Sequence, residues 1–160
     1  MAGLFAPPPA HADQVEPSIG AGLELGLQLG NVSDGTAILL APPKMRIDWS
    51  AFIEENRRWR YRIGLVVPMA GRLALGLRPG IDVPFSLGSS RFELSAGLRA
   101  YLVPYTLWGV EVGTSWERTL FERLVVHAGG GVVAQFFGND LPTDGAIVQI
   151  FASGGVRMPL

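Results

Sequence analysis

The chain has 160 residues, enough for one domain with a single core, and its hydrophobic content is 48%. Charged residues make up only 17%, compared with about 25% in typical soluble domains. The net charge of −1 gives no sign of a nucleic-acid partner, and the absence of cysteine excludes disulfides, thiolate catalysis and cysteine-bound metals.

Residues 1–17 are predicted to be a leader remnant or a flexible N-terminal arm, followed by a barrel domain at residues 18–160. Ala10-His11-Ala12 has the A-x-A form of a signal-peptidase site, but no positively charged segment precedes it. Two alternatives are left for this segment: a disordered terminus rich in proline and alanine, or a signal peptide truncated at its start.

Residues 18–30 predict one long β-strand. The odd-numbered positions from Ile19 to Leu29 are all apolar, and the even-numbered positions are Gly, Ser, Glu or Gln. Because successive side chains of a strand point to opposite faces, this strand has one apolar face and one polar face. The pattern is about twice as long as the usual strand of roughly 5–6 residues. A tilted strand that crosses a membrane needs about 9–11 residues.

The rest of the chain repeats this alternation. Further strands are predicted at residues 44–53, 58–67, 72–83, 91–103, 107–117, 122–137 and 146–158. The longest loops are predicted at residues 31–43 and 138–145, with shorter turns at 54–57, 68–71, 85–90 and 104–105. Pro79 is expected to mark a bulge or a weakly paired point of its strand.

Eight strands joined mostly by short hairpins predict an all-β fold, an eight-stranded antiparallel up-and-down barrel, because closure leaves no unpaired edge. No stretch is long enough for a transmembrane helix of about 18 apolar residues. The alternation is compatible with two barrels: a soluble barrel with an apolar interior, and a transmembrane β-barrel with an apolar exterior.

Three features favour the transmembrane barrel. No charged residue falls on the apolar face of any predicted strand, and a charge facing lipid costs about 2–4 kcal/mol at the bilayer midplane. Twelve of the 21 glycines fall on the polar face, where a water-facing sheet would favour larger residues. Aromatic residues such as Trp49, Tyr61, Trp108 and Trp116 lie toward predicted strand ends, as in the aromatic girdles of membrane proteins.

In this arrangement the polar face lines a narrow lumen, where glycines leave room for long side chains. We expect a network of paired charges there, which favours arginine because its planar fork binds a carboxylate through two hydrogen bonds. The predicted members of this lumen network are Glu24, Arg62, Arg78, Asp82, Glu93, Arg99, Tyr101, Glu111, His127 and Arg157.

Over residues 18–160 the chain resembles the small eight-stranded outer-membrane β-barrels of Gram-negative bacteria. Its end, Ser153-Gly154-Gly155-Val156-Arg157-Met158-Pro159-Leu160, matches the spacing of their C-terminal strand signal, with Leu160 in place of the usual Phe or Trp. The resemblance implies residence in the bacterial outer membrane, the lipid bilayer as partner and insertion by the barrel-assembly machinery. Which loops face the cell exterior is left open, and the two longest, at 31–43 and 138–145, are the first candidates. Neither the oligomeric state nor a specific ligand follows from the resemblance.

The sequence gives only weak indications of a catalytic site. His127, Ser115 and Glu111 supply the residue types of a hydrolytic triad, and some small outer-membrane barrels modify lipids, but a hydrogen-bonding histidine in the lumen is the simpler interpretation. The run Gly129-Gly130-Gly131 lacks the lysine and hydroxyl residue of a phosphate loop. Two histidines do not make a metal site, and no cofactor is predicted.

The sequence therefore predicts a non-enzymatic outer-membrane barrel with a plugged polar lumen, in a structural, adhesive or narrow, porin-like channel role. The alternative is a soluble, lipocalin-like barrel that binds a hydrophobic ligand inside. A lipid-modifying enzyme that uses His127 is a third, weaker hypothesis.

Overall fold

The computed structural model of the chain describes residues 16–32, 35–52, 59–71, 73–121, 123–141 and 145–160. They form eight strands: β1 (Glu16–Val32), β2 (Gly35–Phe52), β3 (Arg60–Pro68), β4 (Leu75–Leu87), β5 (Ser90–Val103), β6 (Leu107–Leu120), β7 (Leu124–Gly138) and β8 (Ile147–Pro159). Among these residues there is no helix with the length and apolar character needed to cross a membrane.

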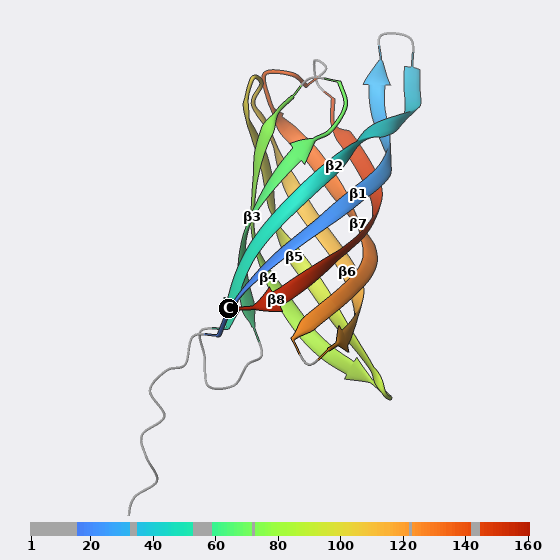
Figure 1. Ribbon diagram of the computed structural model, residues 1–160. Coiled ribbons are helices and arrows are strands. Elements are labelled where there is room, and N and C mark those ends of the chain that lie inside the picture. The colour runs from blue at the N-terminus through green and yellow to red at the C-terminus, as the bar shows by residue number, and fades with distance from the viewer. Residues whose placement is uncertain (1–15, 33–34, 53–58, 72, 122, 142–144) are drawn as a thin grey trace, which may run out of the picture.

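The eight strands close into one antiparallel barrel (Figure 1), in which each strand pairs with its neighbours in sequence and β1 pairs with β8. The start of β1 and the end of β8 lie together at one end of the barrel, which we call the terminal end; the opposite end is the distal end. The pairing of Ser18 with Pro159 completes the ladder there. The predicted fold class is therefore confirmed.

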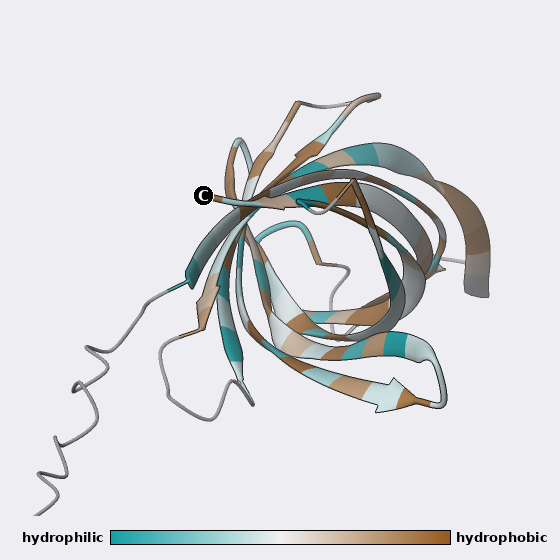
Figure 2. Cartoon of the chain, turned by 60° about the horizontal axis from the view of Figure 1, so that its bottom comes forward, coloured by the Kyte–Doolittle hydropathy of each residue, from teal (hydrophilic) through white to brown (hydrophobic). Residues whose placement is uncertain are grey.

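The apolar face of every strand points outward. Leu23 in the middle of β1 is 55% exposed, whereas the next residue, Glu24, is 1% exposed. The same alternation appears along the other strands as bands of opposite hydropathy (Figure 2). The barrel is thus inverted relative to a water-soluble one. The apolar rows of the described strands are free of charge apart from Arg118, which lies two residues before the end of β6.

The predicted long loop at residues 31–43 is wrong. β2 begins at Gly35 and runs through Pro42 and Pro43. Between the pairs Glu24–Lys44 and Gly26–Ala41, β2 has one more residue than β1, which is a β-bulge. A bulge tolerates proline because its residues need not donate to the ladder, and the pairing of β2 with β3 starts only at Lys44.

The predicted turn at residues 85–90 is also too long. β4 continues to Leu87 and β5 starts at Ser90, so the connection is the two residues Gly88 and Ser89. Gly88 has φ 62°, the left-handed value that two-residue hairpins require. At Pro79 the ladder between β4 and β5 is interrupted, as expected for a weakly paired point, while pairing with Ile63 of β3 is kept.

Strand β1 begins at Glu16, two residues before the predicted start of the barrel. The rest of the predicted leader or arm lies outside the described residues.

Candidate functional site: the charged lumen

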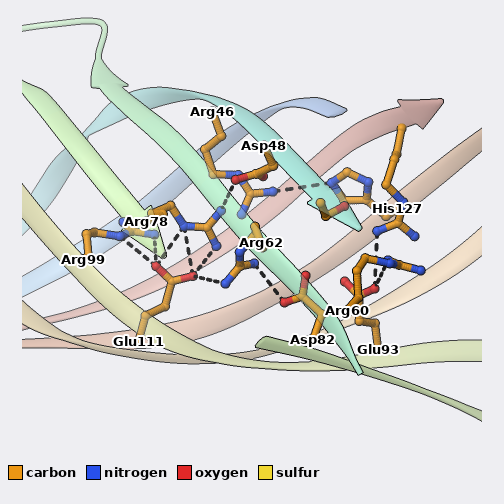
Figure 3. A network of polar contacts seen from close by, with 12 residues as sticks. Arg46, Asp48, Arg60, Arg62, Arg78, Asp82, Glu93, Arg99, Glu111 and His127 are labelled. Atoms are coloured by element: carbon orange, nitrogen blue, oxygen red, sulfur yellow. Dashed lines mark hydrogen bonds and ion pairs between the residues drawn. The ribbon is translucent and has the colours of Figure 1, made fainter. Parts of the chain in front are cut away.

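The interior of the barrel is the only place where the described residues gather buried charge (Figure 3). All ten predicted network residues occupy inward-facing positions: Glu24, Arg62, Arg78, Asp82, Glu93, Arg99, Tyr101 and Glu111 are buried, and His127 and Arg157 are half-buried. The described lumen holds seven basic side chains, Lys44, Arg46, Arg60, Arg62, Arg78, Arg99 and Arg157. It holds six carboxylates, Glu24, Asp48, Asp82, Glu93, Glu111 and Glu117.

Glu111 on β6 is the centre of the network. Arg78 on β4 donates from Nε to both of its carboxylate oxygens at 3.0 and 3.1 Å, and a further NH2 contact completes a fork. Arg99 on β5 donates from Nε to Oε2 of Glu111 at 2.8 Å. Two arginines therefore share one carboxylate, and the side chain of Arg78 also reaches Asp48 on β2 at 2.8 Å.

Arg99 extends the network across the lumen to Glu24 on β1. Lys44 on β2 lies 3.3 Å from the same carboxylate and contacts Gln149 on β8, whose amide donates back to Glu24 at 3.2 Å. Sequence reasoning left both Lys44 and Gln149 out of the network. Their pairing depends on which strands meet across the lumen, which alternation does not reveal.

A second cluster lies nearer the terminal end. Arg60 on β3 and Arg157 on β8 both contact Glu93 on β5, and both also approach Glu117 on β6. Four strands are thus connected by two arginines and two carboxylates. A buried charge without a partner costs several kcal/mol, so this reciprocal pairing is what permits so many charges inside.

Glycines make room for these side chains, as at Gly80 on β4. A Cβ atom there would lie 2.7 Å from NH2 of Arg62 and 2.8 Å from the carbonyl oxygen of Ala96. The absence of a side chain leaves room for the Arg62 guanidinium, whose NH1 lies 3.2 Å from Oδ1 of Asp82.

The distal part of the lumen is apolar instead. Val66, Ala74, Tyr101 and Leu107 form a buried cluster, against which Tyr105, Leu141 and Ile147 pack. We call these seven residues the distal cap. Tyr101, predicted as a member of the polar network, belongs to this cap, and its hydroxyl has no hydrogen-bond partner among the described residues.

Two further apolar side chains point inward without having been predicted to do so. Val133 is completely buried, and the Phe151 ring lies under the Arg99 guanidinium with 5.2 Å between the ring centroid and Cζ. A cation–π contact of this kind gives an arginine a favourable apolar neighbour.

The three residues considered as a hydrolytic triad, His127, Ser115 and Glu111, do not form one. The His127 ring contacts NH2 of Arg46 at 3.4 Å, and Glu111 is held by Arg78 and Arg99. Between Ser115 and His127 the described residues show no hydrogen bond. In the described part of the chain no group of three acidic or histidine side chains is placed to hold a metal ion.

Aromatic side chains form a band at each end of the outer surface. Trp49, Tyr61, Phe92 and Trp116 lie toward the terminal end, where Phe92 pairs with Trp116. Trp108 pairs with Phe137 near the distal end, next to Phe136. All four tryptophans are exposed: Trp49 62%, Trp59 46%, Trp108 42% and Trp116 36%.

Two solved bacterial barrels share this fold. Neisserial surface protein A (NspA) aligns with a TM-score of 0.66 and 14% identity, covering 92% of this chain and 99% of that one. The N-terminal β-barrel domain of Pseudomonas aeruginosa OprF aligns with a TM-score of 0.52 and 9% identity, covering 91% and 100%. No family model and no curated protein sequence matches the chain. The expected likeness to small outer-membrane barrels is confirmed in the fold.

Proposed function

We propose that the protein is a non-enzymatic β-barrel of the bacterial outer membrane with a structural or adhesive role and a plugged lumen. The observation that carries the proposal is the inverted barrel: an apolar exterior surrounds an interior crossed by paired charges. The charged interior also removes the basis for a lipocalin-like pocket, which needs an apolar cavity.

The exterior supports the lipid bilayer as the principal partner. Apolar rows between two aromatic bands match the apolar belt and girdles of transmembrane barrels. Arg118 lies beyond the Trp116 position toward the terminal end, where its charge reaches the headgroup region. Insertion by the barrel-assembly machinery belongs to the same proposal and is supported by the C-terminal strand pattern.

A structural role fits the lumen better than a channel does. The ion pairs join β1, β4, β5 and β6 across the interior, and the distal cap covers them on one side. Eight strands enclose an interior that side chains largely fill. We therefore expect neither solutes nor ions to pass.

An adhesive role is supported by the β1–β2 hairpin, which projects at the distal end (Figure 1). Three consecutive residues of β2 are exposed there, Ile38 66%, Leu39 56% and Leu40 80%. Because consecutive residues point to opposite faces, both faces of β2 carry exposed apolar side chains at this point.

Planar bilayer recording tests the proposal. The chain is refolded and inserted, with folding checked by heat-modifiable migration on a gel, and current is recorded in 1 M KCl. We expect a folded protein without conductance steps. Discrete steps from the folded form would contradict the plugged lumen, and recovery of the purified chain as a detergent-free soluble monomer would contradict the membrane location.

A further inference from the structure

Among the described residues, the charges inside the lumen do not balance. Seven basic side chains face six carboxylates, and Arg46 on β2 is the unmatched one: no carboxylate oxygen of the described residues lies within 4.0 Å of its guanidinium. Arg46 is only 5% exposed. The carboxylates of Asp48, Glu24 and Glu111 attract it only from a longer distance. A buried guanidinium without a directly paired counter-charge is unfavourable, so a further negative charge close to Arg46 would stabilise it.

Hydrogen-bond donors near Arg46 are also without acceptors. Nε of Arg46 and Nε of Arg62 have no partner among the described residues. NH2 of Arg46 donates to Nε2 of His127, which assigns the ring proton to Nδ1, and that Nδ1 has no partner either. Three buried donors therefore lack an acceptor, whereas the buried Oδ1 of Asp82 already lies 3.2 Å from NH1 of Arg62.

Arg46, Arg62, His127 and Asp82 all line the same internal cavity of about 50 Å³. Figure 3 shows Arg46, Arg62 and His127 around this part of the network. Small residues such as Ser50 and Gly113 form other parts of the cavity wall. A single water needs only about 10–15 Å³, so the space also fits a larger monatomic ion.

We infer that this cavity binds one small monovalent anion of the halide class between Arg46, Arg62 and His127. An anion accepts from the three unpartnered donors and brings the lumen charge to balance. Water alone could satisfy the donors but would leave Arg46 without a directly paired counter-charge.

The anion reaches its site from the terminal end. The distal cap closes the other side with apolar side chains, which do not replace the hydration of an ion. Toward the terminal end the cavity is lined by Glu93 and Arg157, and Arg157 also lines the mouth of the barrel between Glu16 and Pro159.

Anomalous diffraction from crystals of the full chain grown in sodium bromide tests the inference. We expect a bromide peak inside the barrel, within about 3.5 Å of the donors on Arg46 and His127. Density at this position without an anomalous signal identifies water and overturns the inference. Bromide peaks on the outer surface alone, an adventitious ion only, overturn it as well.

A solution measurement separates the site from surface binding. Line broadening of the ³⁵Cl NMR signal is titrated for the folded protein and for Arg46→Met, which keeps the length of the side chain but removes its charge. We expect the variant to lose the saturable broadening, with affinity lowered at least about tenfold, and the matched variant Arg118→Met on the outer face to keep it. Equal broadening in both variants, each shown to be folded by heat-modifiable migration, contradicts the assignment to Arg46.

Discussion

The guanidinium of Arg99 on β5 binds the carboxylate of Glu24 on β1 through two hydrogen bonds, NH1 to Oε1 at 2.6 Å and NH2 to Oε2 at 2.8 Å. The two strands are four positions apart in the closed ring, so this pair joins opposite walls of the barrel. Both side chains are almost completely buried. Removal of either side chain therefore leaves the other as a buried charge without this ion-pair partner.

Replacement of Arg99 by Met is expected to lower the free energy of unfolding by about 3–5 kcal/mol, because it leaves Glu24 and Glu111 with one cation fewer inside the barrel. The double variant Glu24→Gln/Arg99→Met should lose less than the sum of the single variants. Urea titration of the folded protein in lipid vesicles measures all three. Arg118→Met is the control and should change stability by less than about 0.5 kcal/mol. Strict additivity would show that the pair does not act as a unit.

A charge introduced on the outer face should be costly only near mid-strand. Leu23→Arg is expected to cost about 2–4 kcal/mol, and Leu87→Arg at the end of β4 about 0–1 kcal/mol. Leu23 is 55% exposed and Leu87 71%, so a water-facing surface would tolerate both. The comparison uses the same unfolding titration, and equal tolerance of the two changes would argue against a lipid-facing exterior.

Substitution of a glycine in the barrel wall should lower the stability by an amount that depends on the space beside it. Gly80→Ala is expected to destabilise by about 1–3 kcal/mol, because the new Cβ meets the Arg62 guanidinium and a backbone carbonyl at less than 3 Å. Gly30→Ala is the matched change in β1, where the nearest atom, Cγ1 of Ile147, is 3.8 Å away. Thermal unfolding midpoints compare them, and an equal loss at both sites would contradict this account of the lumen wall.

The sequence was sufficient for the strand number and for the ten polar residues predicted to face inward, but not for the inward-facing Val133 and Phe151. Strict two-residue periodicity places Glu24 and Arg78 on the polar face of their strands. That this face points inward was predicted from the glycines, the aromatic residues and the missing charges on the other face, and both residues are buried. The prediction failed at Pro42 and Pro43, because proline signals a turn unless a bulge accommodates it, and bulges depend on the partner strand.

Periodicity was also insufficient to predict which side chains contact one another inside the lumen. Asp48 meets Arg78 and Phe151 meets Arg99 because the stagger of the strands brings them to one height. Neither stagger nor height is encoded in local alternation. The imbalance at Arg46 emerged only when each cation could be assigned its carboxylate.

Access to the lumen should be one-sided, and a chain without cysteine is suited to testing this by labelling. A cysteine at Ser18, half-buried by the terminal mouth, should react with a negatively charged methanethiosulfonate. A cysteine at Val66, completely buried within the distal cap, should not react. Mass spectrometry of the folded protein reads both, and labelling at Val66 would show that the cap admits water.

The inverted barrel is tested most directly by the native tryptophans in vesicles of lipid brominated along its acyl chains. All four indole rings lie exposed on the outside of the barrel, so bromine should quench most of the fluorescence of the folded, vesicle-bound protein relative to unbrominated lipid. Unchanged fluorescence in brominated vesicles, with the folded protein free in the aqueous phase, would contradict a barrel that faces lipid.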